Sequence, residues 1–283
     1  MKSWQSRLSN LASYPVPLRL GIFLFILVFL WLPLALPLWL IFQDDPNATT
    51  IATMGALFVL FLILVHLWGR WVYREPNLLR RYGWRWTKRH GIDLLQGLSL
   101  GIMLPFALFA LMGALGWVTW HGGTNVPRIV LEGLLSGLGV GMAEELVFRG
   151  WLHDELKRDY APKTTLWVNA LSFAILHFLK PLEEIVRTFP QFPGLVLLGL
   201  ALVWAKRSRR GRLGVCIGLH GGLVWGYYIL NVGQIIEIGD RVSPWITGVD
   251  GNPVAGCMGL LFLSFLVLAY RYQARSQRRP FQN

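Results

Sequence analysis

Two adjacent glutamates and an arginine, Glu144, Glu145 and Arg149, interrupt an otherwise apolar stretch at residues 141–150. An ionisable side chain at membrane depth costs roughly 2.5–3.5 kcal/mol on insertion scales, so such residues mark functional sites by default. Glu145 and Arg149 are four residues apart and share a helical face, so we expect them to form an ion pair. Glu144 points about 100° away from Glu145 and is free to face another group.

Two histidines lie in other apolar stretches, His177 near the end of one and His220 among the glycines of residues 214–222. Those glycines allow other backbone to approach closely. A carboxylate and two imidazoles in a dry cavity match a hydrolytic zinc site with one open position. They also match a metal-free site, in which a glutamate activates water and histidines stabilise the oxyanion. Both alternatives predict peptide or ester hydrolysis, and the H-E-x-x-H zinc helix is absent.

Apolar runs of membrane-spanning length carry these residues. Apolar residues make up 54% of the 283-residue chain, and several runs exceed the roughly 18 residues that mark a spanning helix. The sequence therefore predicts an all-α fold, a polytopic integral membrane bundle that forms one transmembrane domain over residues 1–283. Eight spans are expected, at residues 18–42, 49–70, 94–120, 129–156, 163–180, 191–205, 213–233 and 253–270.

The basic residues alternate with these spans. With the N-terminus in the cytoplasm, 22 of the 27 Lys and Arg residues fall on the cytoplasmic side. The four on the opposite side are Arg128, Lys180, Arg187 and Arg241. This positive-inside pattern places both termini and a basic tail, residues 271–283, in the cytoplasm. Contact with anionic headgroups accounts for the net charge of +12, so we expect no nucleic-acid partner.

At the charged motif the sequence resembles the CAAX prenyl protease type II family of intramembrane endopeptidases. This family is also called the Abi family, for CAAX proteases and bacteriocin-processing enzymes. Its signature begins with E-E-x-x-x-R and continues with F-x-x-x-H, and both are complete here, at residues 144–149 and 173–177. The resemblance covers roughly residues 130–233, so the motif-bearing core is expected at about residues 129–233.

The third motif of the family, H-x-x-x-N or H-x-x-x-D, is half present. His220 is in place, but Val224 stands four residues later. In the family the residue at that position is thought to assist at the oxyanion or the metal. The polar residues that are candidates to replace it are Asn231, Tyr227, Tyr228 and Asn252. Asn231 follows His220 by eleven residues, about 16 Å along a straight helix, so it cannot simply substitute there.

The resemblance implies an intramembrane peptidase in which Glu144 activates water, supported by Glu145 and Arg149. His177 and His220 would complete the site. They would act either as Zn²⁺ ligands together with Glu144, or as groups that position water and stabilise the oxyanion. The implied partners are membrane lipid and a peptide or a prenylated, lipid-linked protein. The expected location is a bacterial-type plasma membrane.

Two alternatives remain open. A non-enzymatic membrane immunity or scaffold protein of the same fold is favoured by Val224, which leaves the third motif without its polar residue. A transporter would use the same buried charges, but the two halves of the chain show no repeat.

Overall fold

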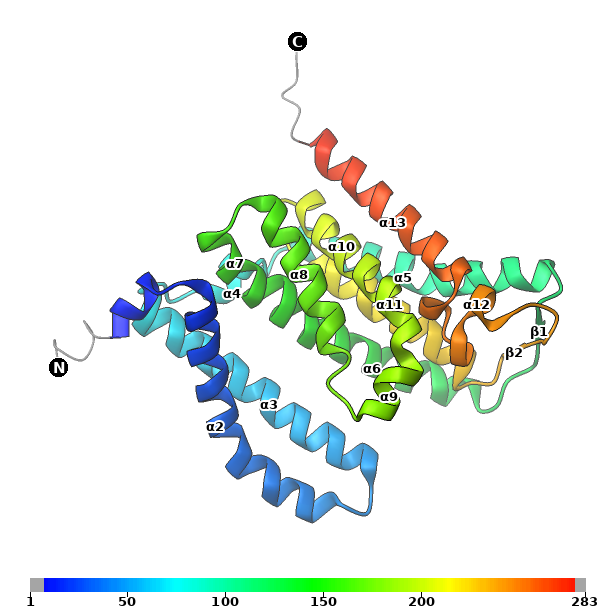
Figure 1. Cartoon of the computed structure of the whole chain (residues 1–283), viewed down its shortest axis with the longest axis horizontal. Helices are drawn as coiled ribbons and strands as arrows, with labels where there is room; N and C mark the ends of the chain where they lie inside the picture. Colours follow the sequence, from blue (N-terminus) through cyan, green and yellow to red (C-terminus); the bar gives the residue numbers. More distant parts are fainter. Residues whose placement is uncertain (1–7, 278–283) are drawn as a thin grey trace, which may run out of the picture. The chain divides into compact units, whose positions relative to one another are not determined.

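The computed structural model describes residues 8–277, whose regular structure is helical apart from one two-stranded sheet (Figure 1). The chain divides into two compact units. Unit 1 runs to Arg81 and adds Asp154–Asp159, whereas unit 2 comprises Tyr82–His153 and continues from Tyr160. The organisation as one transmembrane domain stays a prediction.

Unit 1 is built on a helical hairpin of α2 (Val16–Phe42) and α3 (Pro46–Trp68), which lie side by side (Figure 1). The side chain of Asp45 accepts hydrogen bonds from two backbone N–H groups in the first turn of α3, and it thereby caps the helix. A π-helical turn at Gly69–Tyr73 and the short helix α4 (Leu78–Tyr82) follow α3.

A buried charge network holds residues 154–159 within unit 1. Arg19 Nε donates to Glu155 Oε2 at 2.9 Å, and Arg19 Nη2 donates to Asp159 Oδ1 at 3.1 Å. The Tyr73 hydroxyl donates to Glu155 Oε1 at 2.6 Å. Arg19 and Glu155 are almost completely buried, so each needs the other to offset the cost of its desolvation.

Helix α11 (Gly214–Asn231) lies at the centre of unit 2, with α5 (Lys88–Ala114) and α6 (Val126–Glu145) packed along it (Figure 1). Glycines recur every four residues on the contacting faces of all three helices. Small residues at this spacing allow two helix backbones to approach closely. A Cβ atom on Gly137 of α6 would lie only 2.5 Å from the carbonyl oxygen of Gly221 in α11.

Further helices of unit 2 pack outside this centre, and the segment after α6 leads the chain back to unit 1. After α6 the chain continues through a π-helix, Leu146–Leu152, into α7 (His153–Asp159). Helices α8 (Pro162–Leu176) and α13 (Cys257–Ser276) both pack against α10 (Phe192–Ser208).

The sheet pairs β1 (Val118–Trp120) with β2 (Ile236–Ile238) in antiparallel register, with Val118 opposite Ile238. It therefore joins the segment after α5 to the segment after α11. Two short helices, α9 (Leu182–Thr188) and α12 (Pro244–Thr247), lie in the connections before α10 and α13.

Within the described residues, six helical stretches are long and apolar enough to cross a membrane. They are Val16–Phe42, Pro46–Tyr73, Lys88–Ala114, Val126–Asp159, Leu182–Ser208 and Cys257–Ser276. Helices α8 and α11, which lead to His177 and carry His220, are not among them. Helix α8 has 15 residues and is roughly 22 Å long, less than the roughly 30 Å of a hydrocarbon core. The long helices agree with a polytopic helical bundle, whereas the count of eight spans stays a prediction.

The predicted third span, residues 94–120, is wrong at both ends. Helix α5 begins earlier, at Lys88, where the side chain of Thr87 accepts a hydrogen bond from the N–H of His90. It ends at Ala114 because Gly116 adopts a left-handed conformation, with φ +74°. The N–H of Gly116 then donates to Gly113, and the next N–H donates to Met112, a pairing that closes the helix end.

Two other boundaries also differ from the sequence prediction. The connection between the expected spans 163–180 and 191–205 contains the helix α9. The last expected span was to end at residue 270, whereas α13 stays helical to Ser276, within the predicted basic tail of residues 271–283. Residues 278–283 of that tail lie outside the described part of the chain.

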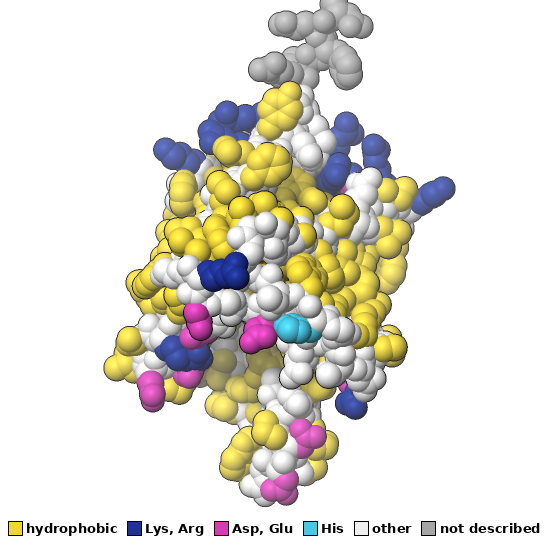
Figure 2. Space-filling view, turned by 90° about the vertical axis from the view of Figure 1, so that its right-hand side faces the viewer, with side chains coloured by type: hydrophobic (Ala, Val, Ile, Leu, Met, Phe, Trp, Pro, Cys, Tyr) yellow, Lys and Arg dark blue, Asp and Glu magenta, His cyan; other side chains and the backbone are white. Residues whose placement is uncertain are grey.

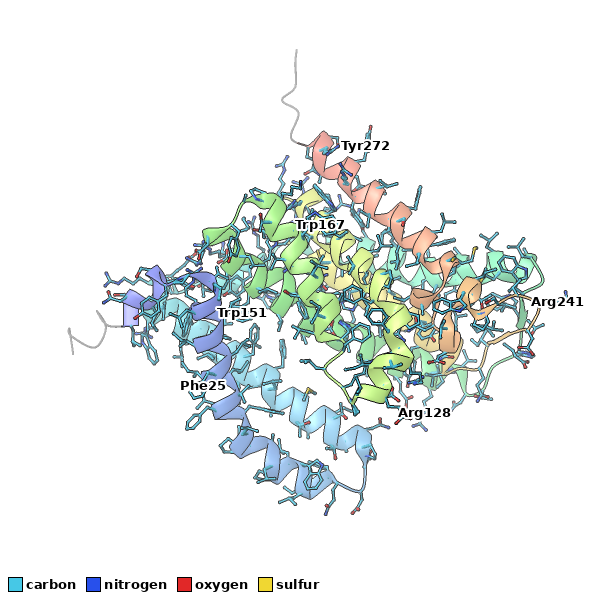
Figure 3. The ribbon with its side chains drawn as sticks, in the orientation of Figure 1. Phe25, Arg128, Trp151, Trp167, Arg241 and Tyr272 are labelled. Carbon is cyan, nitrogen blue, oxygen red and sulfur yellow. The ribbon has the colours of Figure 1, made fainter. Side chains whose placement is uncertain are left out.

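Three labelled side chains mark separate edges of unit 2: Arg128 at the start of α6 lies at the lower edge, Arg241 after β2 at the right-hand edge and Tyr272 near the end of α13 at the top (Figure 3). On the face shown in Figure 2, Lys and Arg side chains gather at the end towards which α13 runs, and hydrophobic side chains cover the adjoining zone.

Replacing Gly218 by Ala is expected to destabilise the protein, because the added methyl group would collide with the carbonyl oxygen of Leu94 on α5. Forcing an extra carbon into a close-packed contact costs about 1–3 kcal/mol. Thermal unfolding of the full-length protein in detergent should show a lower Tm. Gly139→Ala is the matched control, since a methyl group there meets nothing within 4 Å. Equal Tm values for both variants would contradict the close packing of α5 on α11.

Candidate active site

The structure brings Glu144, His177 and His220 together from three elements. Glu144 lies in the last turn of α6, His177 caps the C-terminal end of α8, and His220 lies within α11. Glu144 Oε2 is 3.9 Å from His177 Nε2 and also 3.9 Å from His220 Nε2. These residues are 33 to 76 positions apart in the sequence, so only the tertiary packing makes them neighbours.

Glu145 faces the interior instead and holds two partners. Its Oε1 accepts a hydrogen bond from Arg149 Nη1 at 2.9 Å and lies 2.9 Å from His220 Nδ1. Glu145 and Arg149 are both fully buried, and the predicted ion pair between them is confirmed. The contact with His220 was not predicted, and it links Glu145 to the same histidine that faces Glu144.

The hydrogen-bond partners of the two histidines determine which ring nitrogen carries the proton. His177 Nδ1 lies 2.7 Å from the carbonyl oxygen of Phe173, and His220 Nδ1 lies against the Glu145 carboxylate. Both partners can only accept, so both Nδ1 atoms donate. The Nε2 atom of each ring therefore faces Glu144 and remains available for chemistry.

Phe173, the first residue of the F-x-x-x-H motif, packs at the centre of the site. Its ring is fully buried, with its centroid 4.6 Å from the His177 ring and 5.9 Å from the His220 ring. The guanidinium of Arg149 lies 4.3 Å from the same centroid, in cation–π contact. One aromatic side chain thus fixes both histidines and the arginine that balances Glu145.

A π-helix follows the glutamate pair and is secured by two buried side chains that sequence reasoning missed. Asn169 of α8 donates to the carbonyl oxygen of Phe148 at 2.7 Å, and Lys206 of α10 donates to that of Arg149. Single π-helical turns occur often at functional sites. Asn169, Phe173 and His177 recur every four residues on one face, and this spacing is the signal that would have revealed Asn169.

A mainly apolar cavity of about 240 Å³ adjoins the two histidines. Val224, at the incomplete third motif, lines it together with Tyr227 and Asn252. The Tyr227 hydroxyl donates a hydrogen bond to the carbonyl oxygen of Gly251. The side-chain oxygen of Asn252 accepts one from the N–H of Val254, and the side-chain NH₂ group of Asn252 takes no part in that bond.

The other two candidates for the third-motif role lie elsewhere. Tyr228 donates to Glu132 at 3.4 Å, and Asn231 is exposed at the end of α11. Tyr227 and Asn252 are thus the two polar candidates that share the cavity with Val224.

The predicted metal ligands fit zinc in donor type. A ligating histidine commonly donates its other ring N–H to a carboxylate or a carbonyl, as His220 and His177 do here. Donor atoms bound at about 2.1 Å around a tetrahedral ion lie roughly 3.4 Å apart, less than the 3.9 Å found here. As placed, no three His, Cys, Asp or Glu side chains within residues 8–277 have the spacing of a metal site. The partly exposed Glu144 side chain would have to move slightly to complete one.

Residues 126–226 match the family model of the type II CAAX prenyl endopeptidases, Rce1-like. This segment is a domain of that family. It begins with α6, ends within α11 and contains Glu144, Glu145, Arg149, His177 and His220. No curated protein and no solved structure matches the chain.

The match confirms the resemblance inferred from the motifs. Together with the long apolar helices, it makes the chain an integral, multi-pass membrane protein that carries a domain of this family. The roles of the individual residues remain predictions.

Replacing Arg149 by Met is expected to reduce the folded yield and to lower the free energy of unfolding by about 3–5 kcal/mol, because it leaves the Glu145 carboxylate buried without its cation. Chemical or thermal unfolding in detergent measures the loss. Arg128→Met is the matched control. It breaks an i,i+4 pair with Glu132 whose arginine is 70% exposed, and such pairs contribute about 0–1 kcal/mol. Equal losses in the two variants would argue against a buried ion pair at Glu145.

Proposed function

We propose that this protein is an intramembrane peptidase that hydrolyses a peptide bond of a membrane-associated substrate. The observation that carries the proposal is the position of Glu144 Oε2, 3.9 Å from both His177 Nε2 and His220 Nε2. That distance is too long for a hydrogen bond, yet one water molecule can contact the carboxylate and a ring nitrogen together. Membership of residues 126–226 in a CAAX endopeptidase family supports the same reaction.

In the proposed reaction Glu144 takes a proton from this water as its oxygen attacks the carbonyl carbon of the substrate. His177 and His220 can stabilise the tetrahedral oxyanion that forms only as doubly protonated rings, in which Nε2 also carries a proton, because Nδ1 of each ring already donates elsewhere. The proton on Glu144 then passes to the leaving amine nitrogen as the carbon–nitrogen bond breaks. Glu145 and Arg149 do not touch the substrate in this scheme; they hold His220 in position.

If the site binds zinc, Glu144, His177 and His220 are the residues proposed to hold it. Zinc would polarise the substrate carbonyl and lower the pKa of a bound water. In both histidines the Nδ1–H group donates a hydrogen bond to a protein oxygen, which leaves Nε2 as the atom that can bind the metal. This arrangement favours the proposed coordination.

The cavity beside the histidines supports an apolar substrate segment. Leucine, proline and phenylalanine side chains provide most of its lining, and about 240 Å³ accommodates part of an extended or lipid-linked chain. We therefore propose a peptide or a prenylated, lipid-linked protein as substrate, with membrane lipid as the other partner and no nucleic acid. Tyr227 and Asn252 are the proposed replacements for the polar residue that Val224 lacks.

The proposed topology has eight spans, both termini in the cytoplasm and a bacterial-type plasma membrane as the location. The alternation of basic residues along the sequence supports this topology, with Arg128 and Arg241 proposed to lie outside. The short helix α8 would cross only part of the bilayer alone. Helix α8 packs on α10, which shields that side of α8 from lipid. The polar side chain of Asn169 is satisfied within the bundle by its hydrogen bond to Phe148.

Glu144→Gln is expected to lower turnover of a farnesylated CAAX reporter peptide by about 10²–10⁴-fold, since an amide cannot accept the proton of the attacking water. Cleavage is followed by mass spectrometry in detergent or liposomes. Glu132→Gln on the same helix is the control, because Glu132 pairs with Arg128 and Tyr228 and lies about three turns of α6 away from Glu144. Unchanged turnover in a folded Glu144→Gln protein would rule out the mechanism.

Metal content gives an independent test. The zinc form of the proposal predicts about one Zn²⁺ per chain in the purified protein, with loss of the ion in Glu144→Ala, His177→Ala and His220→Ala. Elemental analysis of each folded variant measures this. An active wild type that contains no metal would establish the metal-free route instead.

The alternative is a non-enzymatic immunity or scaffold protein of the same fold. The observation that favours it is Val224, an apolar residue in the cavity where the family motif has Asn or Asp. It predicts that the wild type and Glu144→Gln both fail to cleave the reporter while both remain folded.

A further inference from the structure

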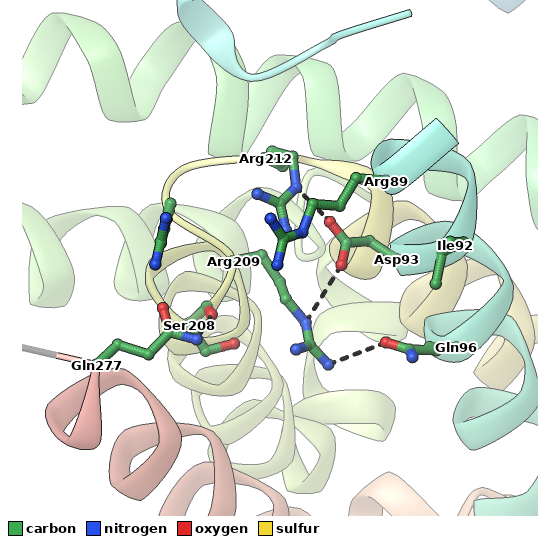
Figure 4. A pocket seen from close by; sticks show the side chains of 9 residues that line it. Arg89, Ile92, Asp93, Gln96, Ser208, Arg209, Arg212 and Gln277 are labelled. Carbon is green, nitrogen blue, oxygen red and sulfur yellow. Dashed lines mark hydrogen bonds and ion pairs between the residues drawn. The ribbon is translucent and has the colours of Figure 1, made fainter. Parts of the chain in front are cut away.

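A second cavity, of about 270 Å³, lies outside the candidate active site, where α5 begins and α10 joins α11 (Figure 4). Four arginines line it: Arg89, Arg209, Arg210 and Arg212. Asp93 is the only carboxylate among its lining residues, so three positive charges are left without a balancing charge. Such an excess in one concave site attracts an anion.

The floor of this basic pocket is a buried ion pair. Arg212 Nε donates to Asp93 Oδ2, and both residues are more than nine-tenths buried. Arg209 Nε lies 3.5 Å from the other Asp93 oxygen, and Arg209 Nη2 donates to Gln96 at 3.2 Å. Figure 4 shows the guanidinium groups of Arg89, Arg209 and Arg212 around this carboxylate. Both carboxylate oxygens of Asp93 are thus already paired with an arginine, Oδ2 with Arg212 and Oδ1 with Arg209.

Arg89 and Arg210 have no such partner. Within residues 8–277, the side chain of neither arginine makes a hydrogen bond or an ion pair. Both are exposed residues on the rim of the pocket. Their charges repel each other and the inner arginines, so an anion placed between them removes an unfavourable interaction.

The turn that carries three of these arginines is rigidly built. Arg210 and Gly211 adopt left-handed conformations in succession, with φ +54° and +83°, which is uncommon for a residue with a side chain. The N–H of Gly211 donates to Lys206 at 3.0 Å, and that of Leu213 donates to Gly83 at 3.1 Å. These hydrogen bonds close the C-terminal end of α10 and fix the backbone that carries the three arginines.

We propose that this pocket binds the phosphate group of an anionic phospholipid. Guanidinium groups match phosphate oxygens in geometry and charge, and basic pockets between membrane helices on the cytoplasmic side bind such headgroups. The exposed apolar side chains of Ile92 and Leu95 continue along α5 from the pocket and provide a surface for an acyl chain. Trp86, 90% exposed just before α5, is placed as an interfacial anchor at headgroup depth.

The phosphate group itself is shared with soluble anions, whereas the apolar flank on α5 favours a lipid. The ligand would bridge three elements, because Gln277 at the end of α13 also lines the pocket and donates to Ser208 of α10 at 2.6 Å. Binding is therefore expected to stabilise unit 2. This effect is independent of the peptidase reaction, because no residue of the pocket belongs to the candidate active site.

The test uses the full-length protein in a neutral detergent, with dioctanoyl phosphatidylglycerol, dioctanoyl phosphatidylcholine or inorganic phosphate added at equal ionic strength. We expect phosphatidylglycerol alone to raise the Tm in a saturable manner. Native mass spectrometry should show the bound lipid. In Arg89→Gln/Arg210→Gln the apparent Kd is expected to rise roughly thirty-fold, because each arginine near a headgroup contributes to attraction.

The matched control is Arg271→Gln/Arg275→Gln, which removes two exposed arginines of α13 outside the pocket. It should change the apparent Kd less than two-fold. Within residues 8–277 the side chains of Arg89 and Arg210 make no hydrogen bond or ion pair, so their variant is expected to fold with an unchanged Tm in the absence of lipid. Equal shifts with phosphatidylcholine, or equal losses in both double variants, would overturn the proposal. A shift with inorganic phosphate of the same size would overturn the lipid as ligand and assign a soluble anion to the pocket.

Discussion

The buried carboxylate of Glu145 constrains how the helices of the candidate active site pack together. Glu145 is fully buried, and a buried charge is tolerated only when it is paired and hydrogen-bonded. Arg149 supplies the opposite charge from one turn further along, and His220 supplies a hydrogen bond from α11. Phe173 covers the arginine from α8. Three helices therefore have to meet at this carboxylate, and the Glu144 side of the site is built on that meeting point.

Such a meeting is feasible only because the helix backbones approach closely. Gly137 and Gly141 of α6 face Gly221 of α11, and a methyl group on any of them would touch backbone atoms of the other helix. In a membrane the hydrophobic effect does not drive helices together, so close packing and polar contacts carry the association. The glycines around His220 thus serve the chemistry indirectly, since they set the distance between the two helices that carry it.

A second buried ion pair lies between α5 and the segment that leads into α11. Asp93 is buried beside Arg212, as Glu145 is beside Arg149, and in both places a carboxylate on one side of a helix contact is held by an arginine. The difference is what lies next to the pair. Beside Glu145 there are imidazoles and an apolar cavity, which suit bond hydrolysis. Beside Asp93 there are further arginines, which suit anion binding.

The sequence by itself determined the local features. Four-residue spacing predicted the Glu145–Arg149 pair, long apolar runs predicted the membrane helices, and complete motifs predicted the family. Tertiary structure decided the rest: that His220 bonds to Glu145, that Glu144 lies equally far from two histidines, and that Asn169 supports the π-helix. The physical reason is range. Helical periodicity reports contacts within about two turns, whereas these contacts join residues on different helices, whose packing no local pattern encodes.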